Sequence, residues 1–253
     1  MKKFFIINIL GIILCCIILK LILSATPDNQ VMKKINNIEE IKDIHAKIGR
    51  CYDYSEEYKL TCSYGEDKPA YCGGNFVVVL AKSTGKAELY NKCSTQSVIV
   101  QEVVHGNTSL QNGTEIRLIS NESNTSSFYY EPKDTFERRI KRLPGLGYNI
   151  SEYPDYFERI WYYNSALNLM KKEHQYLIMF FEISFDDVHF YYMPYAFSYF
   201  DLNSDYSKPV ITEHGHLAEY CDYYENEMFG SSQEAVDDFY RMKAEILKQY
   251  LGA

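Results

Sequence analysis

The chain has 253 residues, with 26 Lys and Arg against 34 Asp and Glu, which gives a net charge of −8. This length allows one large domain or two small ones with a real core. Residues 1–25 contain three lysines and no acidic residue, so residues 26–253 carry a net charge near −11. We therefore expect no nucleic-acid partner, and this charge disfavours anionic lipids, because basic surfaces bind both. It favours solubility, a basic partner or cations.

The N-terminal segment is the most distinctive part of the chain. Lys2 and Lys3 precede sixteen uncharged residues, Phe4–Leu19, and after Lys20 the apolar sequence continues to Ala25. A helix of this length reaches about 33 Å, enough for one bilayer crossing. We expect residues 1–25 to be a transmembrane anchor that contacts the lipid bilayer through residues 4–25. The remainder then lies outside the cytoplasm, because positively charged ends stay on the cytoplasmic side.

Two other interpretations of this segment remain open. A signal peptide cleaved near Ala25 would leave a secreted or periplasmic protein, although Leu23 fits the small-residue cleavage rule poorly. A buried core helix is disfavoured, because few soluble helices begin at residue 4 with no acidic residue nearby. The first two interpretations place the bulk of the chain in the same compartment.

Five cysteines follow the apolar segment, and four of them fall between residues 51 and 93. In an oxidising compartment this spacing predicts two disulfides with three possible pairings. The fifth cysteine could pair with another chain, lie buried or bind a metal. The five are Cys51, Cys62, Cys72, Cys93 and Cys221.

Residues 29–48 carry an apolar residue every three or four positions, which predicts an amphipathic helix that ends at Gly49. We interpret residues 26–49 as a helical stalk and residues 50–253 as one extracytoplasmic domain. At the start of that domain, a hairpin is predicted with strands Phe76–Leu80 and Ala87–Cys93 around a turn at residues 83–86. Further strands are predicted at Ser97–Val104 and Glu115–Ile119.

Residues 105–127 are rich in Asn, Ser and Thr. Together with residue 149 they contain five N-x-[ST] sequons, at Asn107, Asn112, Asn121, Asn124 and Asn149. In a eukaryotic or viral protein these sequons predict an exposed glycosylated region. In a bacterial protein they indicate only a polar loop.

The C-terminal half combines helices and strands. Helices are predicted from Asp134 to Leu143, from Pro154 to about Lys172, and from Ser231, where Ser231 and Glu234 are spaced as a capping box. Strands are predicted at Tyr176–Ile183 and His189–Met193. Helices and strands are grouped rather than alternating, so we expect an α+β fold with a mainly antiparallel sheet and 3–4 helices after the N-terminal membrane or signal helix.

Two compositional features of the domain have plain structural interpretations. The basic cluster Arg138–Arg142 is interpreted as the polar face of a short helix. The chain contains 24 Tyr and a single Trp. We favour packing over a tyrosine-lined recognition surface as the reason for this abundance.

Familiar catalytic signatures are absent from the sequence, which has no GxSxG elbow, Walker loop or HExxH motif. His214, His216 and Cys221 are the best candidate metal ligands, because His and Cys bind transition metals and alternate strand residues face one way. With an open fourth position they would form a catalytic zinc site. Residues 201–205 resemble half of a calcium loop, but Tyr206 and Thr212 break the pattern, and a turn explains them equally well.

These observations favour a membrane-anchored or secreted extracytoplasmic domain that binds a protein partner and is not catalytic. Such a domain could be an envelope-located inhibitor, an immunity-type factor or an adaptor in a surface complex. One alternative is a metal-dependent hydrolase that uses His214, His216 and Cys221. The other is a structural surface glycoprotein.

Overall fold

The computed structural model describes eleven segments: residues 33–52, 74–90, 93–121, 128–130, 133–152, 154–159, 161–185, 188–193, 197–204, 207–211 and 216–252. The predicted anchor, residues 4–25, lies outside these segments. Among the residues that are described, none of the helices has the length and apolar character needed to span a bilayer.

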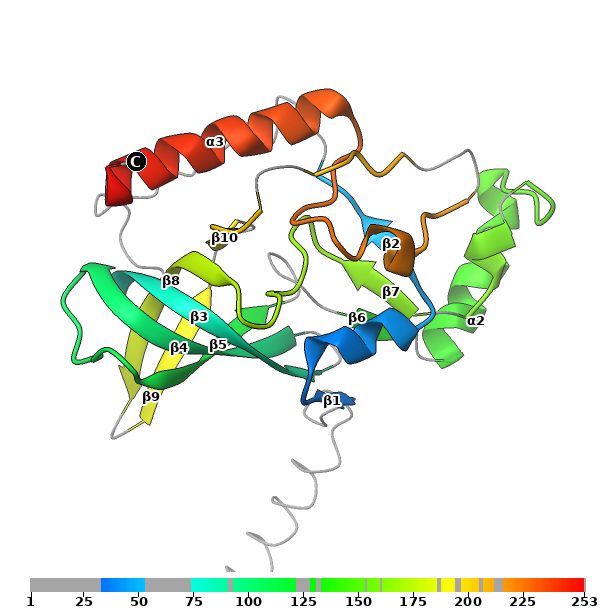
Figure 1. Ribbon diagram of the computed structural model, residues 1–253. Helices are drawn as coiled ribbons and strands as arrows, with labels where there is room; N and C mark the ends of the chain where they lie inside the picture. The colour runs from blue at the N-terminus through cyan, green and yellow to red at the C-terminus, as the bar shows by residue number, and fades with distance from the viewer. Residues whose placement is uncertain are drawn as a thin grey trace, which may run out of the picture.

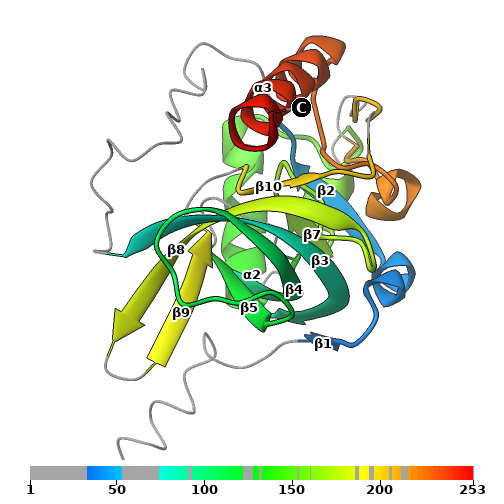
Figure 2. The ribbon, with the colours of Figure 1, turned by 60° about the vertical axis from the view of Figure 1, so that its left-hand side comes forward.

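A closed five-stranded barrel is the centre of the fold (Figures 1 and 2). One long strand pairs with two different neighbours, and this double pairing closes the ring. All neighbours are antiparallel except β5 and β9, which are parallel. In ring order the strands are β3 (Asn75–Leu89), β4 (Cys93–His105), β5 (Glu115–Asn121), β9 (Val188–Met193) and β8 (Gln175–Phe185).

Numbered within the barrel, the strand order is 1-2-3-5-4-1, and the third and fifth strands are parallel. This is the connectivity of the oligonucleotide- and oligosaccharide-binding barrel, a small Greek-key barrel. Two short strands extend the sheet beyond the ring. β1 (Lys33–Ile35) pairs with β3, and β10 (Tyr199–Asp201) pairs with β8.

A second, three-stranded sheet lies beside the barrel, with the order β2 (Ala46–Arg50), β7 (Trp161–Asn164) and β6 (Phe128–Tyr130). It has its own buried cluster, in which Phe128 packs edge-on against Tyr163 and Tyr220. The Tyr220 hydroxyl bonds to the side chain of Asn168, and the Tyr199 hydroxyl donates to the Asn168 carbonyl. These tyrosines fill the interior with satisfied hydroxyl groups, which agrees with the packing interpretation.

The described residues contain two α-helices, α2 (Lys133–Arg142) and α3 (Gln233–Leu251), and four 3-10 turns. The turns are η2 (Ile38–Asp43), η4 (Pro144–Leu146), η5 (Pro154–Phe157) and η6 (Tyr220–Tyr223). α3 begins at its N-cap Ser232, one residue after the predicted cap, and packs Val236, Phe239 and Ile246 into the barrel cluster. α2 lies outside the barrel, on the side of the three-stranded sheet (Figure 1).

The predicted α+β class is wrong, because the fold is mostly β and centres on the closed barrel. Several strands were placed correctly by local pattern, but their closure into a ring depends on pairings between distant segments. The two described α-helices are also fewer than the 3–4 helices that were predicted.

The predicted helix over residues 29–48 is wrong in its described part, which forms β1, η2 and β2 instead. Ile35, Ile38, Ile41 and Ile44 are buried as expected, but they recur every three residues. That interval is the period of a 3-10 helix, not of an α-helix. A capping box between Asn37 and Glu40 starts the 3-10 turn, and the alternating burial of Ile44, Ala46 and Ile48 then fits a strand.

Two further predictions are corrected. Residues 154–172 form η5, β7 and an extended segment rather than a helix, because the aromatic run Trp161–Tyr163 suits a strand better than a helix. The predicted hairpin around residue 85 is a single strand, β3, whose pairing with β4 shifts between Ser83 and Ala87. The residues in between make a bulge rather than a reversal of the chain.

A buried lysine fastens α3 to the barrel. The Lys243 ammonium donates to the Asp201 carbonyl at 2.5 Å, to the Ser204 carbonyl, and to the Glu227 carboxylate at 2.8 Å. The second Glu227 oxygen accepts the Asp201 backbone N–H at 2.8 Å. Three separate segments therefore meet at one buried ion pair.

We expect Lys243→Met to lower the free energy of unfolding by about 1–3 kcal/mol, because it leaves the buried Asp201 and Ser204 carbonyls and the Glu227 side chain without their donor. Urea denaturation at neutral pH measures the change. Lys248→Met is the matched control in the same helix, because Lys248 is exposed, and it should cost less than about 0.5 kcal/mol. Equal losses in the two variants would contradict the role given to Lys243.

Candidate binding groove on the barrel face

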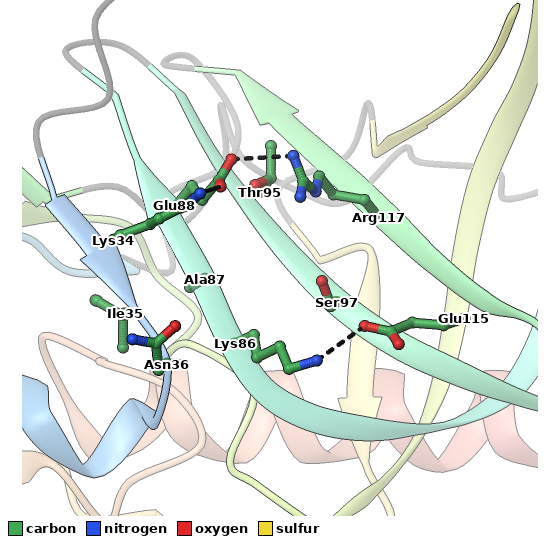
Figure 3. A pocket seen from close by; sticks show the side chains of 10 residues that line it. All are labelled: Lys34, Ile35, Asn36, Lys86, Ala87, Glu88, Thr95, Ser97, Glu115 and Arg117. Carbon is green, nitrogen blue, oxygen red and sulfur yellow. Dashed lines mark hydrogen bonds and ion pairs between the residues drawn. The ribbon is translucent and has the colours of Figure 1, made fainter.

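A groove of about 300 Å³ lies on the outer face of the barrel, where β1, β3, β4 and β5 run side by side (Figure 3). Strand alternation produces this polar face. Val98 and Leu118 point into the barrel and are fully buried, so their neighbours Ser97 and Arg117, which pair across β4 and β5, point outward. The lining residues are Lys34, Ile35, Asn36, Lys86, Ala87, Glu88, Thr95, Ser97, Glu115 and Arg117.

Glu88 is the fixed centre of the groove and is only 8% exposed. Its carboxylate accepts Lys34 Nζ at 3.1 Å and Arg117 Nη1 at 3.0 Å, and these arrive from opposite sides (Figure 3). The Tyr90 hydroxyl donates to it at 2.9 Å. Burial alone would raise the pKa of Glu88, but the bonds from Tyr90 and Lys34 and the charge of Arg117 lower it overall. Glu88 is therefore held as a fully bonded anion.

The β3 bulge shapes the other end of the groove. Gly85 has a φ of +74°, and a Cβ there would lie 2.7 Å from Cβ of Lys172, so the position requires glycine. The Thr84 hydroxyl accepts the Lys86 backbone N–H at 3.2 Å and donates to the Ser97 carbonyl at 2.9 Å. Lys86 then reaches toward Glu115 at 3.5 Å (Figure 3). The bulge thus places a cation at the rim.

The groove contains three cations and two carboxylates, in a chain whose net charge is −8. The Glu88 carboxylate already accepts hydrogen bonds from within the protein. The polar groups that remain for a ligand are therefore largely the hydrogen-bond donors of the lysine, arginine and hydroxyl side chains. The hydroxyls that line the groove, Thr95 and Ser97, have no histidine beside them in the lining. This arrangement can hold a ligand through hydrogen bonds and charge.

The predicted metal ligands are only partly described. His214 lies outside the described residues, while His216 and Cys221 are exposed. Burial raises the pKa of the Cys221 thiol, and the charges of Asp222 and Glu219 raise it further, which disfavours the thiolate that binds metal. Among the described residues, no group of three or more His, Cys, Asp or Glu side chains is placed to hold a metal ion.

The calcium-like segment forms a turn. Asp201 Oδ1 accepts the Asn203 backbone N–H at 2.9 Å, and Asp201 Oδ2 contacts His174 Nδ1 at 2.8 Å. Both carboxylate oxygens of Asp201 are therefore used within the protein, as the turn interpretation requires. Asp205 lies outside the described residues.

Cys51, Cys93 and Cys221 are free thiols, so no disulfide joins any two of these three. Burial raises the pKa of Cys51 to about 11, which makes its thiol unreactive at neutral pH. Cys62 and Cys72 lie outside the described residues, so a disulfide between them stays a prediction.

Ser184, His189 and Glu182 resemble a catalytic triad in composition but not in geometry. The Ser184 hydroxyl lies 3.0 Å from His189 Nδ1, and Glu182 Oε1 lies 3.4 Å from the same nitrogen. In a working triad the acid and the nucleophile contact opposite ring nitrogens. A protonated Nδ1 can donate to Glu182 but cannot then accept the serine proton.

Sequence reasoning missed the groove. Its local signal was the alternation of polar and apolar residues over 115–118, which predicts an exposed polar face on that strand. Lys34 could not be connected with Glu88 by any local pattern, because 54 positions separate them in the sequence.

Comparison with known proteins adds no relative, because no protein-family model matches the chain and no curated protein matches it. The function must therefore be argued from the geometry.

We expect Glu88→Gln to lower the free energy of unfolding by about 1–3 kcal/mol at pH 7, because it removes charge-assisted bonds to Lys34 and Arg117. The folded pKa of Glu88 lies below the ordinary value of 4.5, so its stabilisation is present above that pH. The stabilisation is lost as the pH falls through the lowered pKa. Urea denaturation at pH 7 and at acidic pH should show the difference between wild type and variant shrinking. Glu115→Gln, at a longer and exposed pair, should change stability by less than about 0.5 kcal/mol.

Glu227 should respond to pH in the opposite direction. Burial raises its pKa from 4.5 to about 7, although Lys243 opposes this shift. The folded protein therefore keeps this proton over a range in which the unfolded chain has lost it. Its contribution to stability is present below pH 4.5 and is lost as the pH rises through 7, by about 3 kcal/mol. Denaturation across this range should be flatter for Glu227→Gln than for wild type, and parallel curves would contradict the assignment.

Proposed function

We propose that this chain is a membrane-anchored or secreted extracytoplasmic domain that binds a protein partner in the groove of the barrel face. In this role it would act as an inhibitor, an immunity-type factor or an adaptor in a surface complex. The N-terminal apolar segment supports the location, and the groove supports the mode of action.

The observation that carries the proposal is the bonding of Glu88. A buried carboxylate with three donors fixes Lys34, Tyr90 and Arg117 before any ligand arrives. Binding then costs less side-chain ordering, which is the main advantage of a pre-organised site. The remaining donors of Arg117 and the Lys86 ammonium face the groove and suit carbonyl or carboxylate groups of a partner.

The fold supports this position by analogy. Barrels of this connectivity bind ligands across the face of their second and third strands, which here are β4 and β5. Such an analogy concerns the surface and not the ligand. The acidic net charge disfavours the nucleic-acid ligands of many such barrels, and the protein partner proposed here is one of the ligand classes that remain, beside oligosaccharides.

The two alternatives remain predictions from the sequence. A hydrolase centred on His214, His216 and Cys221 has no described three-ligand cluster in its favour. A glycoprotein gains partial support from Asn107 and Asn112, which are exposed in the loop between β4 and β5.

A photo-crosslinking amino acid at Ser97, in the full chain expressed in its own host, tests the proposal. We expect one discrete adduct from this position and none from the same probe at Glu245, which is exposed on α3. Adding Lys86→Glu should reduce the adduct about tenfold, because charge reversal at the rim weakens binding without touching the bonds of Glu88. The same adduct from both probe positions, or its persistence in the Lys86 variant, would place the partner elsewhere.

A further inference from the structure

A second surface, which we call the α2 patch, consists of Arg138, Lys141, Arg142, Leu146 and Ile150. None of the residues of α2 is buried. The helix is attached instead by Leu143, which is buried directly after its last turn, and by a contact from Arg139 to the Glu158 carbonyl at 3.4 Å. Its outer side therefore faces solvent along its whole length.

The α2 patch is basic in an acidic protein. Residues 133–150 contain five basic and two acidic side chains, so the rest of the chain carries a net charge near −11. The two acids occupy the first half of the helix, where Lys133 approaches Glu137 at 3.9 Å and Arg138 approaches Asp134 at 3.5 Å. Within the described residues Lys141 and Arg142 make no ion pair. The unpaired charge is concentrated at the C-terminal end.

Two large apolar side chains follow these cations closely in the chain. Leu146 is 58% exposed and Ile150 is 62% exposed, although both belong to an ordered loop. The Gly147 backbone N–H donates to the Pro144 carbonyl at 3.0 Å, and the Tyr148 N–H donates to the Leu143 carbonyl at 3.2 Å. Gly147 permits this loop through its φ of +87°. The loop is thus built to hold two large aliphatic side chains in water.

We propose that the α2 patch docks on an anionic lipid surface, with Arg138, Lys141 and Arg142 at the headgroups and Leu146 and Ile150 inserted between them. Exposed basic residues followed closely by exposed aliphatic residues have the composition of interfacial membrane contacts. The acidic remainder of the protein is repelled by such a surface, so only the α2 end can approach it.

The predicted anchor supplies the second reason for a lipid occupant. Seven residues separate Ala25 from β1, and seven extended residues span at most about 25 Å. The domain is then held beside the bilayer at high effective concentration, so a weak contact is sufficient. The inference rests on the membrane location in the proposed function and is independent of the groove.

The test uses the full chain in nanodiscs of phosphatidylcholine alone or in an equal mixture with phosphatidylglycerol. An environment-sensitive fluorescent amino acid replaces Ile150, and brominated lipids serve as the quencher. We expect quenching at position 150 in the anionic discs, at least several-fold weaker quenching in the neutral discs, and none at Gln111, an exposed residue in the loop between β4 and β5.

Charge variants separate electrostatic docking from simple proximity. Lys141→Glu with Arg142→Glu should abolish the quenching, while Lys208→Glu with Lys248→Glu, an equal charge change at exposed sites away from α2, should leave it intact. Equal quenching in both lipids, or in both double variants, would refute the proposal. Co-elution of the chain with the discs shows separately whether the N-terminal segment inserts. If the chain does not insert, the same quenching measurement is made with added vesicles of the same two lipid compositions.

Asn149 provides an independent check, because its sequon lies within the α2 patch. A glycan there would separate Ile150 from any membrane. Peptide mapping by mass spectrometry of the protein from its own host should show Asn149 unmodified, and occupancy of this site would overturn the inference.

Discussion

The fold depends on the double pairing of β3, which joins β4 along one edge and β8 along the other. The sheet can close into a ring only if its strands curve, and β3 curves at the register shifts of its pairing with β4. Glycine makes the close approaches possible. At Gly106, with a φ of +100°, a Cβ would lie 2.3 Å from the Phe76 carbonyl oxygen. A side chain there would push the end of β4 away from the start of β3.

Closure of the barrel also explains why the buried carboxylates beside it are either hydrogen-bonded to donors or protonated. Inside the ring Val77, Val79 and Ile178 leave no place for a free charge, so carboxylates near the wall must be paired or protonated. Glu88 and Glu227 represent these two solutions. Glu88 lies on the outer face, where three donors hold it as an anion. Glu227 lies beneath α3, where burial outweighs its one ammonium partner and raises its pKa. The two groups therefore respond to pH in opposite directions.

Local pattern predicted the elements better than their assembly. The strands around 97–104, 115–119, 176–183 and 189–193 and the helix around 134–143 are confirmed, because alternation, turn residues and capping act over a few positions. The parallel contact of β5 with β9 joins residues about seventy positions apart, and no local pattern encodes it. The same limit hid the groove, since Lys34 and Arg117 meet at Glu88 only once β1, β4 and β5 have assembled beside β3. The isoleucine repeat before residue 50 correctly predicted which side chains are buried. It wrongly predicted an α-helix, where the structure has strands and a 3-10 turn.

The chain order separates the two proposed surfaces. β6, α2 and β7 all fall between β5 and β8, the third and fourth strands of the ring, so the barrel closes without them. A segment inserted between these two strands can be basic in an otherwise acidic protein without disturbing the barrel core. The groove instead belongs to the sheet itself, because β1, β3, β4 and β5 all contribute to it. A protein built this way can hold its orientation with one surface and recognise a partner with the other, since neither shares a residue with the other.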